Sequence, residues 1–394
     1  MQEFSRRGFQ SVIITSDSNA LTRVPDLKSP FLIQQDGDLK ICWVRTMKYS
    51  AAKSLRRILS WVDFEWRLFR MPQKLLPRPD TIIVSSLSLL TILNGLRLRR
   101  KFGCRLILEI RDIWPLTLTE EGDFSRFNPF VWFLGLVEKL GYRYADEVVG
   151  TMPNLGVHVA DVLGYQRPVH CIPMGVGEIP QDDFSLVPDD YKQNYLPSGK
   201  FVVAHAGTIG ISNALEVFLK CAASLDDRQD IHFLIIGDGG LRDFYREKYA
   251  HCGNVTFAPK VPKQAVHSIL RRCDLLYFSV HISRVWDFGQ SLNKVVDYML
   301  SGKPILASYT GFPSMINEAD CGSYVPAGDV LALRDEVLRY AAMSSKERDV
   351  IGKRGRAWLL ARRHYSVLAT DYLEVMFSGQ YSTWADGAGR QDHP

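Results

Sequence analysis

The residues best suited to chemistry lie in one short segment, FGQSLNKVVDYMLSGKP at Phe288–Pro304. Ser291 is suited to cap a helix there, and a glycine near the end of the segment is suited to terminate it. Asn293, Lys294 and Asp297 then share one polar face. Free amides at a helix start, a lysine in the first turn and a carboxylate one turn later can bind a diphosphate and a ribose diol. A solvated charged face is the alternative, which we favour less because glycines frame the helix and an apolar strand follows.

Two glycine loops follow apolar, strand-like runs earlier in the chain. The loop Gly207–Gly210 follows FVVAHA, and the loop Gly237–Gly240 follows HFLII. Glycines let backbone amides approach a phosphate or ribose closely, although glycine also serves simply to make strand-to-helix turns. Each loop alone is therefore only a candidate nucleotide site.

Other catalytic and metal-binding patterns are either absent from the sequence or lie in an unsuitable place. The D-x-D at 36–38 lies in a polar turn before the strand-like run LKICWV, and the nine histidines show no H-E-x-x-H. Gly-x-Ser-x-Gly and the Gly-Lys-Ser/Thr ending of a phosphate loop are absent, as is Gly-x-Gly-x-x-Gly in the window Cys221–Lys248. These absences disfavour a metalloenzyme, a serine hydrolase and a nicotinamide enzyme.

The strand-like and helix-like segments that must position these residues alternate along the chain. Five apolar runs from SVIIT to VHCIP occupy the first 175 residues, and six more from FVVAHAG to GSYVP begin near Lys200, each followed by a helix-like stretch. This alternation predicts two parallel sheets. Ligands bind off the carboxyl ends of such strands, which is where the loops above should lie.

We therefore expect two domains. The opening MQEFSRRG looks like the end of a helix, so the first domain is expected to lack its first strand, and PQDDFSLVPDDYKQNYLPSG has the composition of a linker. The predicted division is an N-terminal Rossmann-like domain at 1–179, a linker at 180–199, a C-terminal Rossmann-like domain at 200–362, a helix at 363–378 that crosses back to the first domain, and a mobile tail at 379–394.

Composition excludes several classes of protein. With 394 residues, of which 46% are hydrophobic and 23% charged, the chain is too long for a single small module and can bury substantial cores. The seven cysteines are scattered and never form C-x-x-C, so a reducing cytoplasm fits best. No signal peptide and no run of 18 apolar residues is present, so we expect a chain that does not span a membrane.

One region is strongly basic, with fourteen Lys and Arg against three acids between Arg45 and Arg105. Within it, the segment Ser50–Met71 places two apolar stripes on a helix. We expect the stripe that includes Leu59 and Trp66 to pack inward, and the other stripe to meet an anionic membrane, unless a neighbouring helix or second subunit covers it. The residues expected to face the membrane are Trp61, Phe64, Leu68 and Arg57. No nucleic-acid partner is expected.

The segment Phe288–Pro304 resembles the donor-binding motif of family 4 glycosyltransferases of the GT-B fold, in particular a bacterial surface-polysaccharide branch that reads S-P-N-K-l-x-D/E-Y-M-a-x-G-K-P. LILEIRDIWPLTL at Leu106–Leu118 is similar to the E-x-R-D-L-W-P signature of that branch, and ADEVVGTMPNL, CIPMG, AHAGTIG and LIIGDGG follow in the expected order. The resemblance implies an α/β protein with two doubly wound, Rossmann-like domains facing a cleft. It also implies a retaining transfer of sugar from a nucleotide diphosphate donor, with no metal or other cofactor.

The resemblance also implies site residues. Asp297 matches the second acid of the E-x7-E motif and would bind the ribose, whereas Gly289 stands where the first acid is usual. The usual phosphate-clamping arginine and lysine align with Thr208 and Asn213, so we expect Lys294, with help from Arg284, to stabilise the departing diphosphate. The full donor-binding set is Gly207, Thr208, Gly210, Gly237, Asp238, Gly239, Val261, Arg284, Ser291, Leu292, Asn293, Lys294 and Asp297.

In the first domain, Arg111 falls where many relatives have a histidine beside the donor sugar, and Asp112 follows it. The expected catalytic residues are Arg111, Asp112 and Lys294, and the expected acceptor-side residues are Ser86, Glu109 and Trp114.

The implied activity is transfer from a UDP-hexose or UDP-N-acetylhexosamine to a lipid-linked or saccharide acceptor in bacterial cell-surface polysaccharide biosynthesis. The reaction would occur at the inner face of the cytoplasmic membrane. Two alternatives stay open: a GT-B nucleotide-sugar 2-epimerase, and a non-catalytic GT-B subunit that positions a partner.

Overall fold

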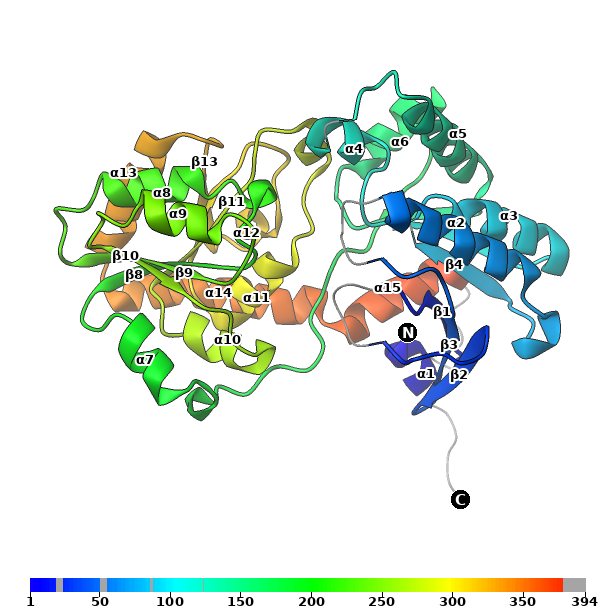
Figure 1. Cartoon of the computed structure of the whole chain (residues 1–394), viewed down its shortest axis with the longest axis horizontal. Coiled ribbons are helices and arrows are strands. Elements are labelled where there is room, and N and C mark those ends of the chain that lie inside the picture. Colours follow the sequence, from blue (N-terminus) through cyan, green and yellow to red (C-terminus); the bar gives the residue numbers. More distant parts are fainter. Residues whose placement is uncertain (19–23, 50–54, 86–87, 123, 378–394) are drawn as a thin grey trace. The chain divides into compact units, whose positions relative to one another are not determined.

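A computed structural model describes residues 1–18, 24–49, 55–85, 88–122 and 124–377 (Figure 1). The chain divides into two compact units. Unit 1 comprises Met1–Thr151, Leu155–Ile172 and Leu368–Pro394, and unit 2 comprises Met152–Asn154 and Pro173–Val367.

The boundary between the units differs from the predicted one. Unit 2 begins at Pro173 rather than after residue 179, because the chain already contacts unit 2 there: the Met174 amide donates to the Ser291 hydroxyl at 3.1 Å. The predicted linker contains η2 (Phe184–Leu186) and α7 (Asp189–Tyr195). Tyr191 of α7 is buried, and its hydroxyl donates to the Pro259 carbonyl at 3.0 Å, which fastens this segment to unit 2. The predicted tail at 379–394 lies outside the described residues.

The strands of unit 1 form two sheets. In the first, β3 pairs in parallel with β1 and antiparallel with β2; the second is parallel, in the order β4-β5-β6-β7. The hairpin of β2 and β3 was not predicted, and its turn holds the D-x-D at 36–38. β1 and β4 each lie at the end of a sheet, while the expected lack of a first strand stays a prediction. The bounds are β1 Val12–Ser16, β2 Phe31–Asp36, β3 Leu39–Val44, β4 Thr81–Ser85, β5 Arg105–Ile110, β6 Glu147–Gly150 and β7 His170–Cys171.

Helices cover both faces of the four-stranded sheet of unit 1. On one face, Gly141 of α5 lies against Ile92 of α3 and Leu108 of β5, and α3 lies between α2 and α5. On the other face, Phe4 of α1 and Leu373 of α15 share a buried cluster with strand residues. The helix predicted to end the second domain and return to the first is α15. The bounds are α1 Gln2–Arg6, α2 Leu55–Arg70, η1 Gln73–Leu75, α3 Thr91–Phe102, α4 Leu116–Glu121, α5 Pro129–Tyr144, α6 Leu155–Leu163 and α15 Tyr365–Phe377.

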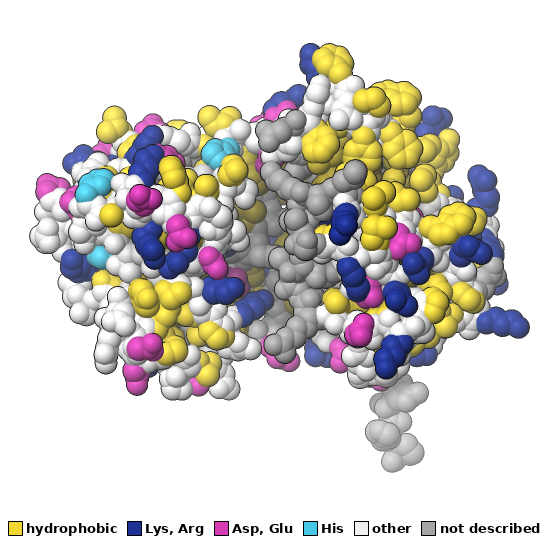
Figure 2. Space-filling view, viewed as in Figure 1, with side chains coloured by type: hydrophobic (Ala, Val, Ile, Leu, Met, Phe, Trp, Pro, Cys, Tyr) yellow, Lys and Arg dark blue, Asp and Glu magenta, His cyan; other side chains and the backbone are white. Residues whose placement is uncertain are grey.

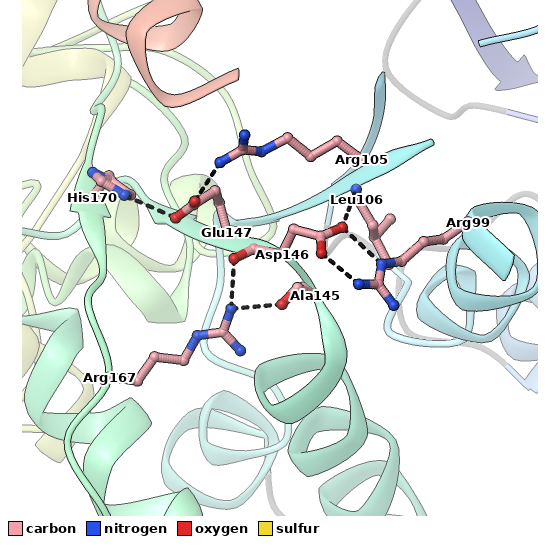
Figure 3. A network of polar contacts seen from close by, with 8 residues as sticks. All are labelled: Arg99, Arg105, Leu106, Ala145, Asp146, Glu147, Arg167 and His170. Carbon is pink, nitrogen blue, oxygen red and sulfur yellow. Dashed lines mark hydrogen bonds and ion pairs between the residues drawn. The ribbon is translucent and has the colours of Figure 1, made fainter. Parts of the chain in front are cut away.

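Ion pairs join the amino ends of β5, β6 and β7 to α3 (Figure 3). Arg99 of α3 donates two hydrogen bonds to the Asp146 carboxylate, at 2.7 and 2.5 Å. Arg105 pairs with Glu147 at 2.5 Å, and Glu147 also contacts His170 at 3.1 Å. Burial alone would raise the pKa of the Asp146 carboxyl, but the bonds from Arg99 and from the Leu106 amide, together with the charges of Arg99 and Arg105, outweigh it and lower this pKa. The network therefore braces the sheet at the edge opposite its carboxyl-end loops.

Unit 2 is built on one parallel sheet of six strands, in the order β10-β9-β8-β11-β12-β13. All six residues of β9 are buried, as expected of a parallel strand covered on both faces. Val202 and Ala204 of β8 pack toward α10, α11 and α14, whereas Phe201 and Val203 pack toward α8, α9 and α13. These six strands were all predicted. Their bounds are β8 Phe201–Ala206, β9 Ile231–Ile236, β10 Val255–Ala258, β11 Leu275–Ser279, β12 Ile305–Ser308 and β13 Gly322–Val325.

The helices of unit 2 follow the strands in alternation, as the sequence predicted. They are η3 Ile211–Asn213, α8 Glu216–Ala223, α9 Arg242–Lys248, α10 Lys263–Leu270, η4 Arg284–Phe288, α11 Asn293–Ser301, α12 Met315–Glu318, α13 Val330–Ala342 and α14 Ser345–Arg363. Across the described ranges of both units, no helix is long and apolar enough to cross a bilayer.

Candidate functional site

The site of unit 2 lies where its strand order reverses. From β8 the chain proceeds to β9 and β10 on one side, and then continues from β11 to β12 and β13 on the other. The loops that leave β8 and β11 therefore diverge at the carboxyl edge of the sheet, which is where open α/β sheets bind ligands. These loops are 207–210 and 280–292.

The two glycine loops are pressed against each other. A Cβ at Gly237 would lie 1.9 Å from the Gly207 carbonyl oxygen, and a Cβ at Gly239 would lie 2.3 Å from that of Ile209. Both glycines also have positive φ, 149° and 156°. The Ile209 amide donates to the Asp238 carbonyl at 2.9 Å, which extends the ladder between β8 and β9 into the loops. Glycine is thus required at 237 and 239 for loop packing alone.

Lys294 reaches from α11 over the loop that follows β8. Its ammonium donates to the Asn213 side-chain oxygen, and the Asn213 amide donates in turn to the Thr208 carbonyl at 2.8 Å. A Cβ at Gly207 would lie 3.8 Å from the Lys294 Nζ. Burial lowers the pKa of Lys294 to about 8, and no carboxylate of the described residues offsets that burial. The Lys294 ammonium is therefore a half-buried cation with no paired carboxylate among the described residues.

The start of α11 differs from the prediction. Ser291 does not cap the helix, because its hydroxyl accepts the Met174 amide; the N-cap is Leu292, which supplies no side-chain acceptor. The first amides of α11, from Asn293 on, therefore have no side-chain cap. Gly302 ends the helix in the left-handed conformation (φ 74°), as predicted.

Asp297 lies one turn after Lys294 on α11. Partial burial of the carboxyl raises the pKa of Asp297, and the Lys263 cation opposes that effect. Arg284 is exposed at the start of η4, in the loop after β11, and Val261 lies in the loop after β10. Both loops belong to the same edge of the sheet as Gly210.

Sequence reasoning missed two residues close to Lys294. Tyr298 of α11 accepts the Ala206 amide at 2.9 Å, which ties the helix to the end of β8. His205 is fully buried, with Nδ1 3.2 Å from the Tyr277 carbonyl, and burial together with Lys294 lowers its pKa to about 3. A histidine inside an otherwise apolar buried strand was the available signal for this neutral neighbour.

The structure explains why position 289 has no acid. Gly289 has φ of 102°, and a Cβ there would lie 2.5 Å from Cδ of Pro153. Asn154 holds this loop by donating from its amide to the Phe288 carbonyl at 3.0 Å and from its side chain to the Asp287 carbonyl at 2.9 Å. A glutamate would meet both the strained backbone and Pro153, so the carboxylate is excluded on steric grounds.

In unit 1, predicted residues gather at the carboxyl end of β5 and in the loop that follows it. Glu109 accepts the Tyr372 hydroxyl at 2.9 Å and lies 4.0 Å from Arg111. Burial raises the pKa of the Asp112 carboxyl, and the cations Arg111 and Arg57 oppose that effect. Trp114 meets the ring of Trp61 edge-on at 5.4 Å. Ser86 lies outside the described residues.

The predicted orientation of α2 is wrong. Leu68 is buried and Phe64 is half-buried, while Trp61 packs on Trp114 and the Arg57 guanidinium lies over the Trp61 ring at 5.1 Å. The four residues expected to face a membrane thus face the protein, because the loop after β5 and the neighbouring α3 cover them. The outward stripe consists of Leu59, Val62, Trp66 and Phe69.

One comparison with known proteins gives a family match, and it falls within unit 2. Residues 200–342 match the family model described as glycosyl transferases group 1, so unit 2 carries a group 1 glycosyltransferase domain. No curated protein matches the chain in sequence.

Solved structures similar to the chain show the same fold. Sucrose-phosphate synthase from Thermosynechococcus elongatus aligns with 98% of this chain and 92% of its own, at 15% identity and a TM-score of 0.70. A structure described as trehalose-6-phosphate from E. coli bound with UDP-2-fluoro glucose aligns with 94% of each chain, at 10% identity and a TM-score of 0.70. Anabaena HepE in complex with UDP aligns with 86% of each chain, at 14% identity and a TM-score of 0.59. The chain therefore has the GT-B fold of two Rossmann-like units, as the resemblance implied.

Proposed function

We propose that this protein is a retaining, metal-independent glycosyltransferase of family 4 that transfers a hexose or N-acetylhexosamine from its UDP donor to a lipid-linked or saccharide acceptor. The observation that carries the proposal is the desolvated Lys294 ammonium beside the Gly207 loop, next to the uncapped start of α11. Helix amides and a buried cation together suit a diphosphate. The match to a group 1 glycosyltransferase domain and the UDP named for two similar structures support it.

Each residue of the site has a proposed role. Lys294 and the first amides of α11 bind the diphosphate, and Asp297 accepts hydrogen bonds from the ribose hydroxyls. As the bond to the sugar breaks, negative charge grows on the departing phosphate, and the Lys294 cation stabilises it. The acceptor hydroxyl attacks from the face that the nucleotide leaves, and a donor phosphate oxygen takes its proton.

We propose that unit 1 binds the acceptor. Glu109 lies near the carboxyl end of β5, and Arg111, Asp112 and Trp114 follow in the loop, so this end of the strand offers carboxylates, a guanidinium and an indole face to sugar hydroxyls and rings. The structure adds Trp61 to this proposed acceptor set through its contact with Trp114. A lipid-linked acceptor in surface-polysaccharide synthesis would place the reaction at the inner face of the cytoplasmic membrane.

A donor panel tests the function. The protein is incubated with UDP-, GDP- and TDP-sugars, with and without a lipid-linked saccharide acceptor, and both nucleotide release and sugar transfer are measured. Release of UDP together with transfer supports the proposal. Interconversion of the donor sugar alone supports a 2-epimerase, and tight association with another protein without either reaction supports a non-catalytic subunit.

A further inference from the structure

Large apolar side chains are exposed in an unusual concentration on two helices of unit 1. Elsewhere such residues are scattered: the described helices of unit 2 expose at most one each, such as Phe244 on α9 and Leu331 on α13. Figure 2 shows hydrophobic side chains gathered over the region of α2 and α5. Because isolated exposed apolar residues are ordinary and contiguous ones mark a contact surface, this face calls for a partner. The exposed residues are Leu59, Val62, Trp66 and Phe69 on α2, and Trp132, Phe133, Leu136, Leu140 and Tyr144 on α5.

The α2 stripe is a continuous face of the helix. Its members are spaced three or four residues apart, so they lie one above another on a helix. They point away from Trp61 and Leu68, which pack inward. Trp66 and Phe69 stack at 6.0 Å and are 57% and 51% exposed, so their rings form a flat apolar surface in contact with solvent. α3, between α2 and α5, adds the exposed Leu93.

The charge of this face has one sign. All three acids of α2, α3 and α5 are turned inward or covered: Asp63 pairs with Arg67, Glu65 is held by hydrogen bonds from α3, and Glu138 is buried against a histidine. The exposed charged residues on these three helices are Arg56, Arg70, Arg100, Lys101, Lys139 and Arg143, all of them basic.

We propose that the face of α2, α3 and α5 docks on an anionic lipid bilayer. Aromatic rings bordered by cations suit the interface between acyl chains and charged headgroups. Arg70 lies over the Trp66 ring at 5.6 Å and Arg97 over the Phe69 ring at 4.5 Å, which keeps cations beside the inserting rings. A second copy of the chain fits less well, because a two-fold interface would bring six exposed cations against six identical ones. The inference deepens the membrane location proposed above, but it is measured without any sugar transfer.

Vesicle flotation with the full chain tests the docking face. The wild type should float with phosphatidylcholine vesicles that contain about a third phosphatidylglycerol, should not float with pure phosphatidylcholine, and should be released as salt rises toward about 0.5 M. Trp66→Ser/Phe69→Ser should weaken the partition coefficient at least tenfold, on the order expected for two half-buried aromatic rings. Arg70→Glu/Arg100→Glu should weaken it on the order of a hundredfold on anionic vesicles.

A matched variant controls for the general loss of apolar surface. Phe244→Ser/Leu331→Ser removes two equally exposed side chains from unit 2 and should leave flotation unchanged. Thermal melts of every variant, together with UDP binding to unit 2, show that the fold is kept. The inference is overturned if the wild type fails to float at low salt, if the unit 2 control loses flotation as strongly, or if Trp66→Ser/Phe69→Ser converts a dimer to a monomer by sedimentation while vesicle binding persists. If the protein floats but transfers no sugar, the docking inference stands and the proposed function is refuted.

Discussion

Lys294 offers the sharpest test of the nucleotide site, because its removal should move stability and affinity in opposite directions. Lys294→Met keeps most of the aliphatic stem and removes the charge together with the hydrogen bond to Asn213. In the wild type, burial lowers the pKa of Lys294 to about 8, below the usual value near 10.4. A lowered pKa means that the charged ammonium at this position lowers the free energy of unfolding at neutral pH.

The size of the effect follows from that pKa. A pKa of about 8 in place of the usual value near 10.4 corresponds to about 3 kcal/mol, which the variant should recover at pH 7, less the hydrogen bond to Asn213. We expect the ligand-free variant to be about 1 to 3 kcal/mol more stable at pH 7. The unfolded chain binds more protons than the folded one between pH 8 and 10.4, so wild-type stability rises with pH across this window. The advantage of Lys294→Met should therefore disappear by about pH 10.4.

Affinity for UDP should change in the other direction. A bound diphosphate would pair with the Lys294 ammonium. Lys294→Met should therefore bind UDP roughly tenfold to a hundredfold more weakly, as expected for the loss of a charge-assisted hydrogen bond of about 1.5 to 3 kcal/mol. Wild-type affinity should fall as pH rises above about 8, because the ammonium deprotonates and binding must then take up a proton. Lys294→Arg keeps a cation, so its affinity should be independent of pH in this range.

Calorimetry of UDP binding between pH 7.5 and 10, in buffers of different ionisation enthalpy, measures both affinity and proton uptake. Lys353→Met, at an exposed position on α14, is the matched control and should change neither stability nor affinity. The reasoning fails if Lys294→Met binds UDP as tightly as the wild type, or if it is less stable than the wild type at pH 7.

Three further predictions concern single positions. Gly289→Glu should not restore a family-like site but should destabilise the protein by about 2 to 4 kcal/mol, because of the positive φ and the contact with Pro153; a normal melting temperature with increased sugar transfer would contradict this. Asp297→Ala should weaken UDP binding about tenfold but leave 2′,3′-dideoxy-UDP unaffected, and equal losses for both ligands in calorimetry would remove the ribose from its proposed role. Asp146→Asn should cost roughly 1 to 3 kcal/mol at pH 7 through weaker bonds from Arg99. Since the pKa of Asp146 is lowered in the fold, that difference should shrink in denaturation curves as pH falls below about 4, and a constant difference would exclude the ion pair as its cause.

The sequence predicted the parallel strands well, because each is a short apolar run with a helical stretch after it. It failed for β2, whose apolar run is only the three residues Phe31–Ile33 and whose residues are exposed along almost the whole strand. It also failed for α7, where only Tyr191 is buried and seven residues are too few to show a period.

The orientation of α2 shows a different limit. A helix with two apolar stripes has no intrinsic inward face, and the surfaces that α2 meets come from parts of the chain distant in sequence. Trp61 packs against Trp114 of the loop after β5, and Glu65 accepts hydrogen bonds from Thr91 and Asn94 of α3. Helical periodicity alone could identify both stripes but could not choose between them.

The sequence predicted the end of α11 at Gly302, where the pattern is local, but it placed the N-cap wrongly at Ser291 and missed the contacts that join distant loops. Two departures from the family pattern looked independent in the sequence: asparagine at 213 in place of a clamping lysine, and reliance on Lys294. The structure relates them, because the Asn213 side-chain oxygen accepts from the Lys294 ammonium. A lysine at 213 would place a second cation beside one that burial already disfavours, and like charges at such a distance repel. The asparagine therefore holds the Lys294 ammonium near the Gly207 loop, and under the proposed function this single half-buried lysine would act in place of the usual pair.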